Sequence, residues 1–210
     1  MFTLFIFFIK FDKITIMKYI VYRVLKFILY PIFIIIYRPK FEGKSNIPKT
    51  GGVILAGNHT NNLDAAIMIA GPKRVVHMMA KKELFDTKIK RIFFRSMGCI
   101  SVNRSIHDEN AKKEAIDILN KGEVLGIFPE GTINKTDNIV LPFKYGAVSF
   151  AKKTGAYIVP FSITGKYKFN GKIKITYGKA YKVSENLELE NKRLMNKVIN
   201  LLKGENDEKD

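Results

Sequence analysis

The chain has 210 residues, of which 47% are hydrophobic, so it can bury the core of one folded domain and is not an intrinsically disordered protein. Lys and Arg number 36 against 19 Asp and Glu. Unless a general bias toward Lys, Ile and Asn is its source, this net charge of +17 indicates an anionic partner: lipid, nucleic acid or a phosphorylated substrate. The one cysteine, Cys99, excludes an intrachain disulfide and a cysteine-based zinc cluster.

Two apolar stretches open the chain, at residues 2–9 and 14–37. A secretory signal peptide would begin with a basic region and end at a small-residue cleavage site. Both are missing, so we expect the segment to be retained. A membrane span needs about 20 apolar residues in a row, whereas the longest clean run covers only residues 27–37. Residues 1–40 are therefore predicted to associate with a membrane without crossing it.

The basic residues of the second stretch share one side of a helix. At about 100° per residue, Lys18, Arg23 and Lys26 fall within an arc of roughly 140°, opposite Tyr, Ile, Val, Leu and Phe side chains. Such a pattern is typical of a helix at the surface of anionic lipid. We expect Pro31 to kink the helix or end its first half, which favours two short hydrophobic helices dipping into one leaflet. A helix packed on the protein's own core and a spanning helix are the alternatives.

The next part of the chain, residues 41–204, alternates between short apolar runs and helical patterns. This alternation predicts a layered α/β domain with a mixed, partly parallel sheet and flanking helices. A polar linker is expected at 39–50, and a charged tail at 205–210. The predicted strands are 53–57, 75–80, 99–102, 124–128, 157–164 and 172–178, and the predicted helices are 62–70, 84–97, 108–120, 145–154 and 185–203.

A histidine and an aspartate, His59 and Asp64, follow the first of these strands. Five residues along a regular helix turn two side chains about 140° apart, so the pair can meet only if His59 lies in a turn and Asp64 in the first helical turn. Residues 60–62 are turn and N-cap types, which favours this arrangement. Asp64 would then fix the imidazole tautomer and leave the other ring nitrogen as a base. A structural histidine with an N-capping aspartate is the alternative.

Three further segments carry candidate site residues. F-P-E-G-T at 128–132 follows a strand, and the carboxyl ends of strands are where α/β sheets bind ligands. The segment 98–104 ends in Arg104, whose planar fork suits phosphate. Val-Pro at 159–160 lies within a predicted strand, and Lys144 is a further candidate to line the cleft.

In this order, the motifs resemble those of the glycerolipid acyltransferase family, most of all its bacterial members that act on 1-acyl-sn-glycerol-3-phosphate. The resemblance covers residues 50–165. One departure is that Val102-Asn103 precede Arg104, where the family usually has an aromatic or aliphatic residue followed by Asp. The matching motifs are N-H-x-x-x-x-D at 58–64, G-x-x-x-x-x-R at 98–104, F-P-E-G-T at 128–132 and V-P at 159–160.

The resemblance implies transfer of a fatty acyl group from acyl-CoA or acyl carrier protein to the sn-2 hydroxyl of lysophosphatidic acid, giving phosphatidic acid in phospholipid synthesis. His59 would be the general base and Asp64 would orient it, with no covalent acyl-enzyme, no cofactor and no metal. Glu130 would orient Arg104 or bond an acceptor hydroxyl, because a carboxylate cannot hold phosphate by charge. The implied substrate-binding residues are Asn58, Arg104, Glu130, Gly131 and Thr132, with Lys144 as a further candidate.

Two other functions remain open from the sequence. The first is acyl transfer to another lysolipid, since the motifs specify the reaction better than the lipid. The second is a non-catalytic basic membrane-binding module, which would leave the spaced motifs unexplained. A nucleic-acid partner is not expected, because the basic residues are scattered and no recognised binding module is present. The expected location is the cytoplasmic face of the cell membrane, as a peripheral or monotopic protein.

Overall fold

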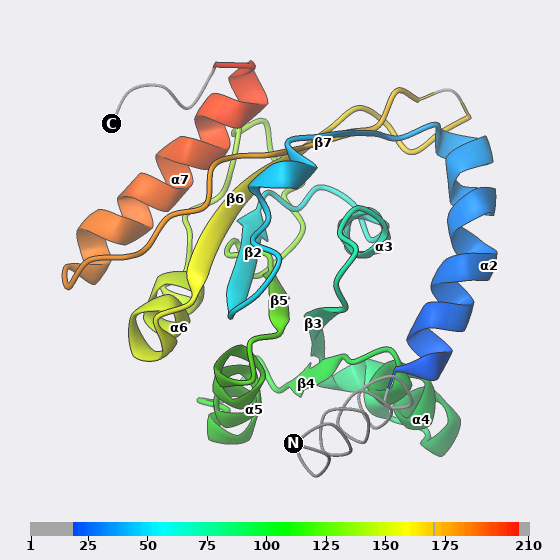
Figure 1. The fold of residues 1–210 in the computed structure, drawn as a ribbon, viewed down its shortest axis with the longest axis horizontal. Helices are drawn as coiled ribbons and strands as arrows, with labels where there is room; N and C mark the ends of the chain where they lie inside the picture. The colour runs from blue at the N-terminus through cyan, green and yellow to red at the C-terminus, as the bar shows by residue number, and fades with distance from the viewer. Residues whose placement is uncertain (1–18, 170, 206–210) are drawn as a thin grey trace, which may run out of the picture.

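The computed structural model describes residues 19–169 and 171–205, which form one seven-stranded sheet with helices on both faces (Figure 1). The predicted apolar stretch at 2–9, Lys18 and residues 206–210 of the predicted tail lie outside the described residues. The predicted α/β fold is confirmed.

The sheet has the order β1-β7-β6-β2-β5-β3-β4, and only β6 and β7 run antiparallel to each other. All five residues of β2 are buried, because β5 and β6 pair with its two edges and helices cover both faces. This explains why the strand is a continuous apolar run. The strands are β1 (Lys40–Glu42), β2 (Val53–Gly57), β3 (Val76–Lys81), β4 (Ile100–Val102), β5 (Val124–Ile127), β6 (Tyr157–Thr164) and β7 (Lys174–Tyr177).

The helices form two layers, each with its own apolar core. One layer contains α5 (Glu109–Asn120), α6 (Gly146–Thr154) and α7 (Leu187–Lys203). The other contains α2 (Ile20–Tyr37), α3 (Asp64–Ala70) and α4 (Lys88–Ser96), on the opposite side in Figure 1. Side-chain caps fix several helix starts, as at α5, where Asp108 accepts the amide of Ala111.

Two sequence predictions in this part of the chain were wrong. The predicted linker 39–50 contains β1, which pairs with β7, and a 3₁₀ turn at Lys44–Asn46. A three-residue strand at a sheet edge with one apolar residue is too short to be recognised from its pattern. The predicted helix 84–97 is divided into a 3₁₀ turn at Lys82–Phe85 and α4, because Thr87 caps the second helix by accepting the amide of Lys90.

Helix α2 directs two of its polar side chains toward the protein and leaves many of its apolar side chains exposed. Tyr22 is buried and accepts the backbone amide of Val76, while Nζ of Lys26 donates to the carbonyls of Ile69 (2.9 Å) and Pro72 (2.6 Å). A surface helix of a soluble protein usually carries polar residues where α2 carries these exposed apolar ones. The exposed apolar residues, called here the outer face of α2, are Ile20, Val21, Val24, Phe27, Ile28, Leu29, Ile32, Ile35 and Ile36.

Two details of the predicted membrane segment need correction. Lys26 faces α3 and not lipid, so it does not belong to a basic stripe at the membrane. The helix also runs through Pro31 to Tyr37, so the proline does not end it. The second half of the helix is held by Phe33 and Tyr37, whose ring centroids lie 4.8 Å apart. Both residues pack against the apolar core that α2 shares with α3 and α4. By length and composition alone, α2 is the one described helix that could cross a membrane.

Candidate active site

Two loops meet at the carboxyl edge of the central strands. β2 and β5 are parallel neighbours, with Ala56 opposite Ile127, so the chain leaves both strands at the same edge. His59 follows β2 and Glu130 follows β5, which brings residues 71 positions apart into contact. Open α/β sheets bind ligands at this edge, and here it carries the predicted motifs.

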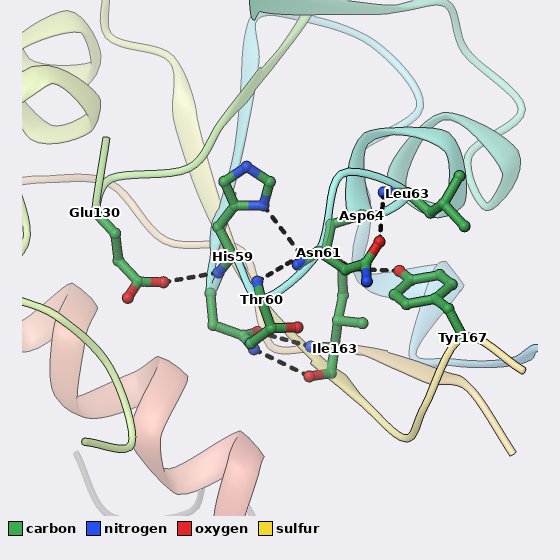
Figure 2. Close-up of polar contacts among 9 residues, drawn as sticks. His59, Thr60, Asn61, Leu63, Asp64, Glu130, Ile163 and Tyr167 are labelled. Atoms are coloured by element: carbon green, nitrogen blue, oxygen red, sulfur yellow. Dashed lines mark hydrogen bonds and ion pairs between the residues drawn. The ribbon is translucent and has the colours of Figure 1, made fainter. Parts of the chain in front are cut away.

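Asp64 lies in the first turn of α3, where its carboxylate organises the preceding loop. Oδ2 accepts the backbone amides of Thr60 (2.6 Å) and Asn61 (2.7 Å) and lies 3.0 Å from Nδ1 of His59. The Asp64 side chain is completely buried. His59 lies in the loop between β2 and α3, and Asp64 in the first turn of the helix as the spacing predicted, so their side chains can meet (Figure 2).

The imidazole of His59 is fixed from two sides. Its ring stacks on Phe128, with centroids 4.0 Å apart and an angle of 10° between the planes. An ionised carboxylate only accepts hydrogen bonds, so the arrangement with Asp64 assigns the ring proton to Nδ1 and leaves Nε2 as the basic nitrogen. The His59 side chain is 15% exposed. It can therefore reach a substrate while most of the ring is shielded from water.

Glu130 binds backbone amides rather than another side chain. Its Oε1 accepts the amide of His59 at 2.7 Å, and its Oε2 accepts the amide of Leu141 at 2.7 Å. The amide of Asn134 donates to the carbonyl of His59, so the loop after β5 holds both sides of the histidine backbone. Burial raises the pKa of Glu130, and these amide donors oppose that rise. Glu130 thus binds the backbone of His59 in place of its predicted partner Arg104, which donates to the carbonyl of Gly131 instead.

Two cations flank Gly131. Nη1 of Arg104 donates to the Gly131 carbonyl at 2.9 Å. Lys144 lies across the same glycine, since a Cβ at position 131 would come within 2.8 Å of the lysine Nζ. Gly131 also has a φ of +71°, so a side chain there would be strained as well as crowded. Asn103, the departure from the family motif, accepts the amide of Ser105 in the turn that presents Arg104.

Asn58 has a structural partner in place of the predicted contact with substrate. Its side chain accepts the amide of Ile163 at 2.7 Å and donates to the carbonyl of the same residue at 3.0 Å. The side chain is 2% exposed. These two hydrogen bonds resemble those between paired strands, and they attach the loop after β2 to β6.

Sequence reasoning missed Tyr167, which joins the site from the connection between β6 and β7. Its hydroxyl donates to Oδ1 of Asp64 at 2.6 Å, and Figure 2 shows it on the opposite side of the carboxylate from His59. No local motif surrounds this tyrosine, and 103 residues separate it from Asp64. Only the pairing of the strands reveals the contact.

Two cavities meet at His59, Arg104 and Phe128. The smaller, about 290 Å³, extends toward α5 and includes Lys112 and Lys144. The larger, about 780 Å³, extends between α3 and α4, includes Thr132 at its mouth loop, and is lined mainly by apolar side chains, among them Ala65, Ile69, Leu84, Phe93, Phe94 and Met97. Cationic side chains are present in both cavities: Arg104, Lys112 and Lys144 line the smaller one, and Lys81, Arg104 and Lys135 line the larger one among its apolar residues.

The remaining candidate groups do not add a nucleophile or a metal site. Cys99 lines the larger cavity but is 7% exposed, and burial raises the pKa of its thiol to about 11. A thiol with that pKa is almost wholly protonated at neutral pH and reacts slowly. Within the described residues, no group of three or more His, Cys, Asp or Glu side chains could hold a metal ion.

Comparison with known proteins gives a consistent family. The acyltransferase family model matches residues 38–164. A 1-acyl-sn-glycerol-3-phosphate acyltransferase of Bacillus subtilis is 34% identical over 66% of this chain and 71% of its own length. One from Borreliella burgdorferi is 36% identical, over 60% of this chain and 51% of its own length.

A solved structure agrees with these matches. The crystal structure of the 1-acyl-sn-glycerophosphate acyltransferase PlsC from Thermotoga maritima superposes with a TM-score of 0.65 at 26% identity, over 79% of this chain and 72% of that one. The matched family segment, residues 38–164, contains the His59–Asp64 pair and the loop after β5. The chain belongs to the acyltransferase family.

Proposed function

We propose that this acyltransferase moves a fatty acyl group from an acyl thioester to the sn-2 hydroxyl of lysophosphatidic acid, giving phosphatidic acid. The observation that carries the proposal is the position of His59, paired with Asp64, where two cavities meet: a smaller one that holds Arg104 and Lys144, and a larger one lined mainly by apolar side chains. The names of the similar proteins from Bacillus subtilis and Thermotoga maritima support this acceptor. Acyl-CoA and acyl carrier protein are the two candidate donors, and the reaction uses no cofactor.

The reaction follows from the tautomer of His59. Nε2 of His59 removes the proton of the acceptor hydroxyl, while the oxygen of that hydroxyl attacks the carbonyl carbon of the thioester. The carbon–sulfur bond then breaks, and the imidazolium returns the proton to the leaving thiolate. Asp64 stabilises the imidazolium between these steps through its bond to Nδ1. The acyl group passes directly to the acceptor, so Cys99 has no role in the transfer.

The phosphate of the acceptor is assigned to the cations beside Gly131. Arg104 supplies a planar donor fork and Lys144 a point charge, and both line the smaller cavity together with His59. Glu130 supports this arrangement indirectly, because it holds the backbone of His59 while Gly131 holds Arg104. Thr132 is exposed at the mouth of the larger cavity, where it can contact the glycerol part of the acceptor.

The larger cavity is assigned to an acyl chain. It begins at His59 and extends between α3 and α4, on the same side of the sheet as the outer face of α2. Burying a hydrocarbon chain against such a lining contributes about 0.8 kcal/mol per methylene group. A chain entering here would lie near the apolar surfaces of α2 and α4, where a lipid substrate would arrive.

We further propose that residues 1–40 form the membrane-associating segment, that 41–204 form the catalytic domain and that the protein lies on the cytoplasmic face of the cell membrane. The outer face of α2 and the exposed Ile89, Ile92 and Phe93 of α4 support this placement. Both helices belong to the same layer of the fold (Figure 1). Lys88, Lys90 and Arg91 beside these apolar residues are suited to anionic headgroups.

The test is an acyl-transfer assay of the full chain in detergent micelles with acyl-CoA or acyl carrier protein and lysophosphatidic acid. His59→Ala should lower kcat by about 10²–10⁴-fold, the usual value of general-base help, with an unchanged circular dichroism spectrum. Asp64→Asn should also be severely impaired, whereas Asp117→Asn, at an exposed ion pair on α5, should match the wild type. Equal turnover by His59→Ala would refute the mechanism. Preference for a lysolipid without a terminal phosphate monoester would refute the acceptor.

A further inference from the structure

The carboxylate of Asp64 is held differently at its two oxygens. Oδ2 receives the amides of Thr60 and Asn61 and faces Nδ1 of His59. Oδ1 receives the hydroxyl of Tyr167, at 2.6 Å (Figure 2). Tyr167 thus opposes the other three contacts across the carboxylate.

We propose that Tyr167 is a positioning residue of the active site, whose hydroxyl fixes the rotation of the Asp64 carboxylate so that Oδ2 faces His59. The inference depends on the proposed function, because it assigns Tyr167 a role in the same proton transfer. Tyr167 does not line either cavity that meets at His59, so it acts through Asp64 and not by touching substrate.

The rotation of this carboxylate needs such a restraint. The terminal torsion of an aspartate is broad and has no sharp staggered minimum. Because Asp64 is completely buried, water has no ready access to Oδ1 if the tyrosine donor is removed. A buried acceptor without a partner is costly. Without the tyrosine donor, only the contacts at Oδ2, from Thr60, Asn61 and His59, would oppose a rotation that moves Oδ2 away from Nδ1 of His59.

Tyr167 is suited to remain a donor. Burial, followed by the nearby charge of Asp64, raises the pKa of its phenol well above the usual value. The hydroxyl therefore keeps its proton throughout the working range of the enzyme. A protonated phenol donates one strong hydrogen bond to the carboxylate, and it does not compete with Asp64 for the Nδ1 proton of His59.

The surrounding chain holds the tyrosine ring in place. The connection from β6 to β7 is closed by a hydrogen bond from the amide of Lys166 to the carbonyl of Gly171. Gly165 permits the turn with a φ of +94°, and a Cβ there would meet the carbonyl oxygen of Lys172 at 2.5 Å. Tyr37, the last residue of α2, packs against the Tyr167 ring with centroids 5.7 Å apart and a 77° angle. The end of the apolar helix therefore supports the residue that orients Asp64.

The experiment compares Tyr167→Phe with the wild type and with Tyr37→Phe, in the full chain and the same detergent. Tyr37→Phe removes a neighbouring hydroxyl but keeps the ring contact, so it should match the wild type. Tyr167→Phe should lower kcat by about 10- to 100-fold, the scale of a small misplacement of a catalytic group, with KM for both substrates unchanged.

A second readout does not depend on turnover. Proton and nitrogen NMR of labelled histidine follows the hydrogen bond between Nδ1 of His59 and Oδ2 of Asp64. In Tyr167→Phe the Nδ1 proton should exchange with water faster than in the wild type, because Oδ2 is no longer held against it. Wild-type kcat and wild-type exchange of this proton in Tyr167→Phe would overturn the inference. A wild-type protein without acyl transfer to lysophosphatidic acid would instead overturn the proposed function, and the exchange of the Nδ1 proton would still test the positioning of Asp64.

Discussion

The carboxylate of Glu130 lies 2.7 Å from the backbone amide of His59 and, through its other oxygen, 2.7 Å from the amide of Leu141. A residue that the family resemblance assigns to substrate binding therefore acts on the shape of the site. The loop after β5 sets the backbone of the histidine, while Asp64 sets its ring. Backbone and ring of His59 are thus positioned by separate carboxylates.

Replacing Glu130 should impair catalysis more than substrate binding. In Glu130→Gln, the side-chain NH2 group would replace one of the two carboxylate oxygens and face a backbone N–H of His59 or Leu141. That backbone N–H would then lack an acceptor, at a cost of about 1–3 kcal/mol. We expect kcat to fall and KM for lysophosphatidic acid to change little, together with a lower melting temperature. Glu188→Gln, at an exposed pair on α7, is the matched control. A rise in KM with unchanged kcat would show that Glu130 contacts the acceptor directly.

Arg104 and Lys144 should contribute to affinity for the phosphate. Removing either cation should raise KM for lysophosphatidic acid, and each charged hydrogen bond is worth about 1.5–3 kcal/mol, or roughly 10- to 150-fold. Arg104→Lys should recover only part of the loss, because Lys lacks the planar fork. Kinetics with Arg104→Ala, Lys144→Ala and the double variant would measure the coupling between them. Lys113→Ala, on the exposed side of α5, is the control. Unchanged KM in the double variant would place the phosphate elsewhere.

The central strands and the His59–Asp64 geometry could be predicted because local patterns specify them. The apolar run of β2 has the predicted bounds, and the turn-forming residues after it indicated that a helix, α3, begins there. The contact between His59 and Glu130 was not predicted, since the sequence indicated only that Glu130 orients Arg104 or bonds the acceptor; the parallel pairing of β2 and β5 brings the two residues to the same edge of the sheet.

The misses share a physical origin: they depend on contacts between distant segments. β1 is a three-residue strand with a single apolar residue, Phe41, and it exists because β7 provides its partner; Gly43 lies against the Tyr177 backbone. The sequence placed Lys26 on the lipid-facing surface of the helix, yet its ammonium group donates hydrogen bonds to the carbonyls of Ile69 and Pro72. The role of Tyr167 could not be predicted from the residues around it, because its partner Asp64 is 103 residues away in the sequence.

Cys99 should be dispensable and slow to react. Burial raises the pKa of its thiol from 9.0 to about 11, so the thiolate fraction at pH 8 falls by about 100-fold. Modification by a disulfide reagent should be correspondingly slow in the folded protein and fast after unfolding in guanidinium. Cys99→Ala should retain most of its turnover, because no covalent acyl-cysteine forms. Loss of activity in this variant with a normal melting temperature would contradict direct transfer.

The outer face of α2 should determine membrane affinity. Phe27 is 83% exposed and Ile35 is 68% exposed, an arrangement that costs free energy in water and is relieved in lipid. Burying each contributes about 1.5–3 kcal/mol, so Phe27→Glu with Ile35→Glu should weaken binding to phosphatidylglycerol vesicles by at least about 100-fold in sedimentation assays. Leu189→Glu changes an equally apolar, 59% exposed residue on α7, in the other helix layer, and should bind as the wild type does. If the double variant keeps wild-type vesicle affinity, α2 does not form the membrane contact.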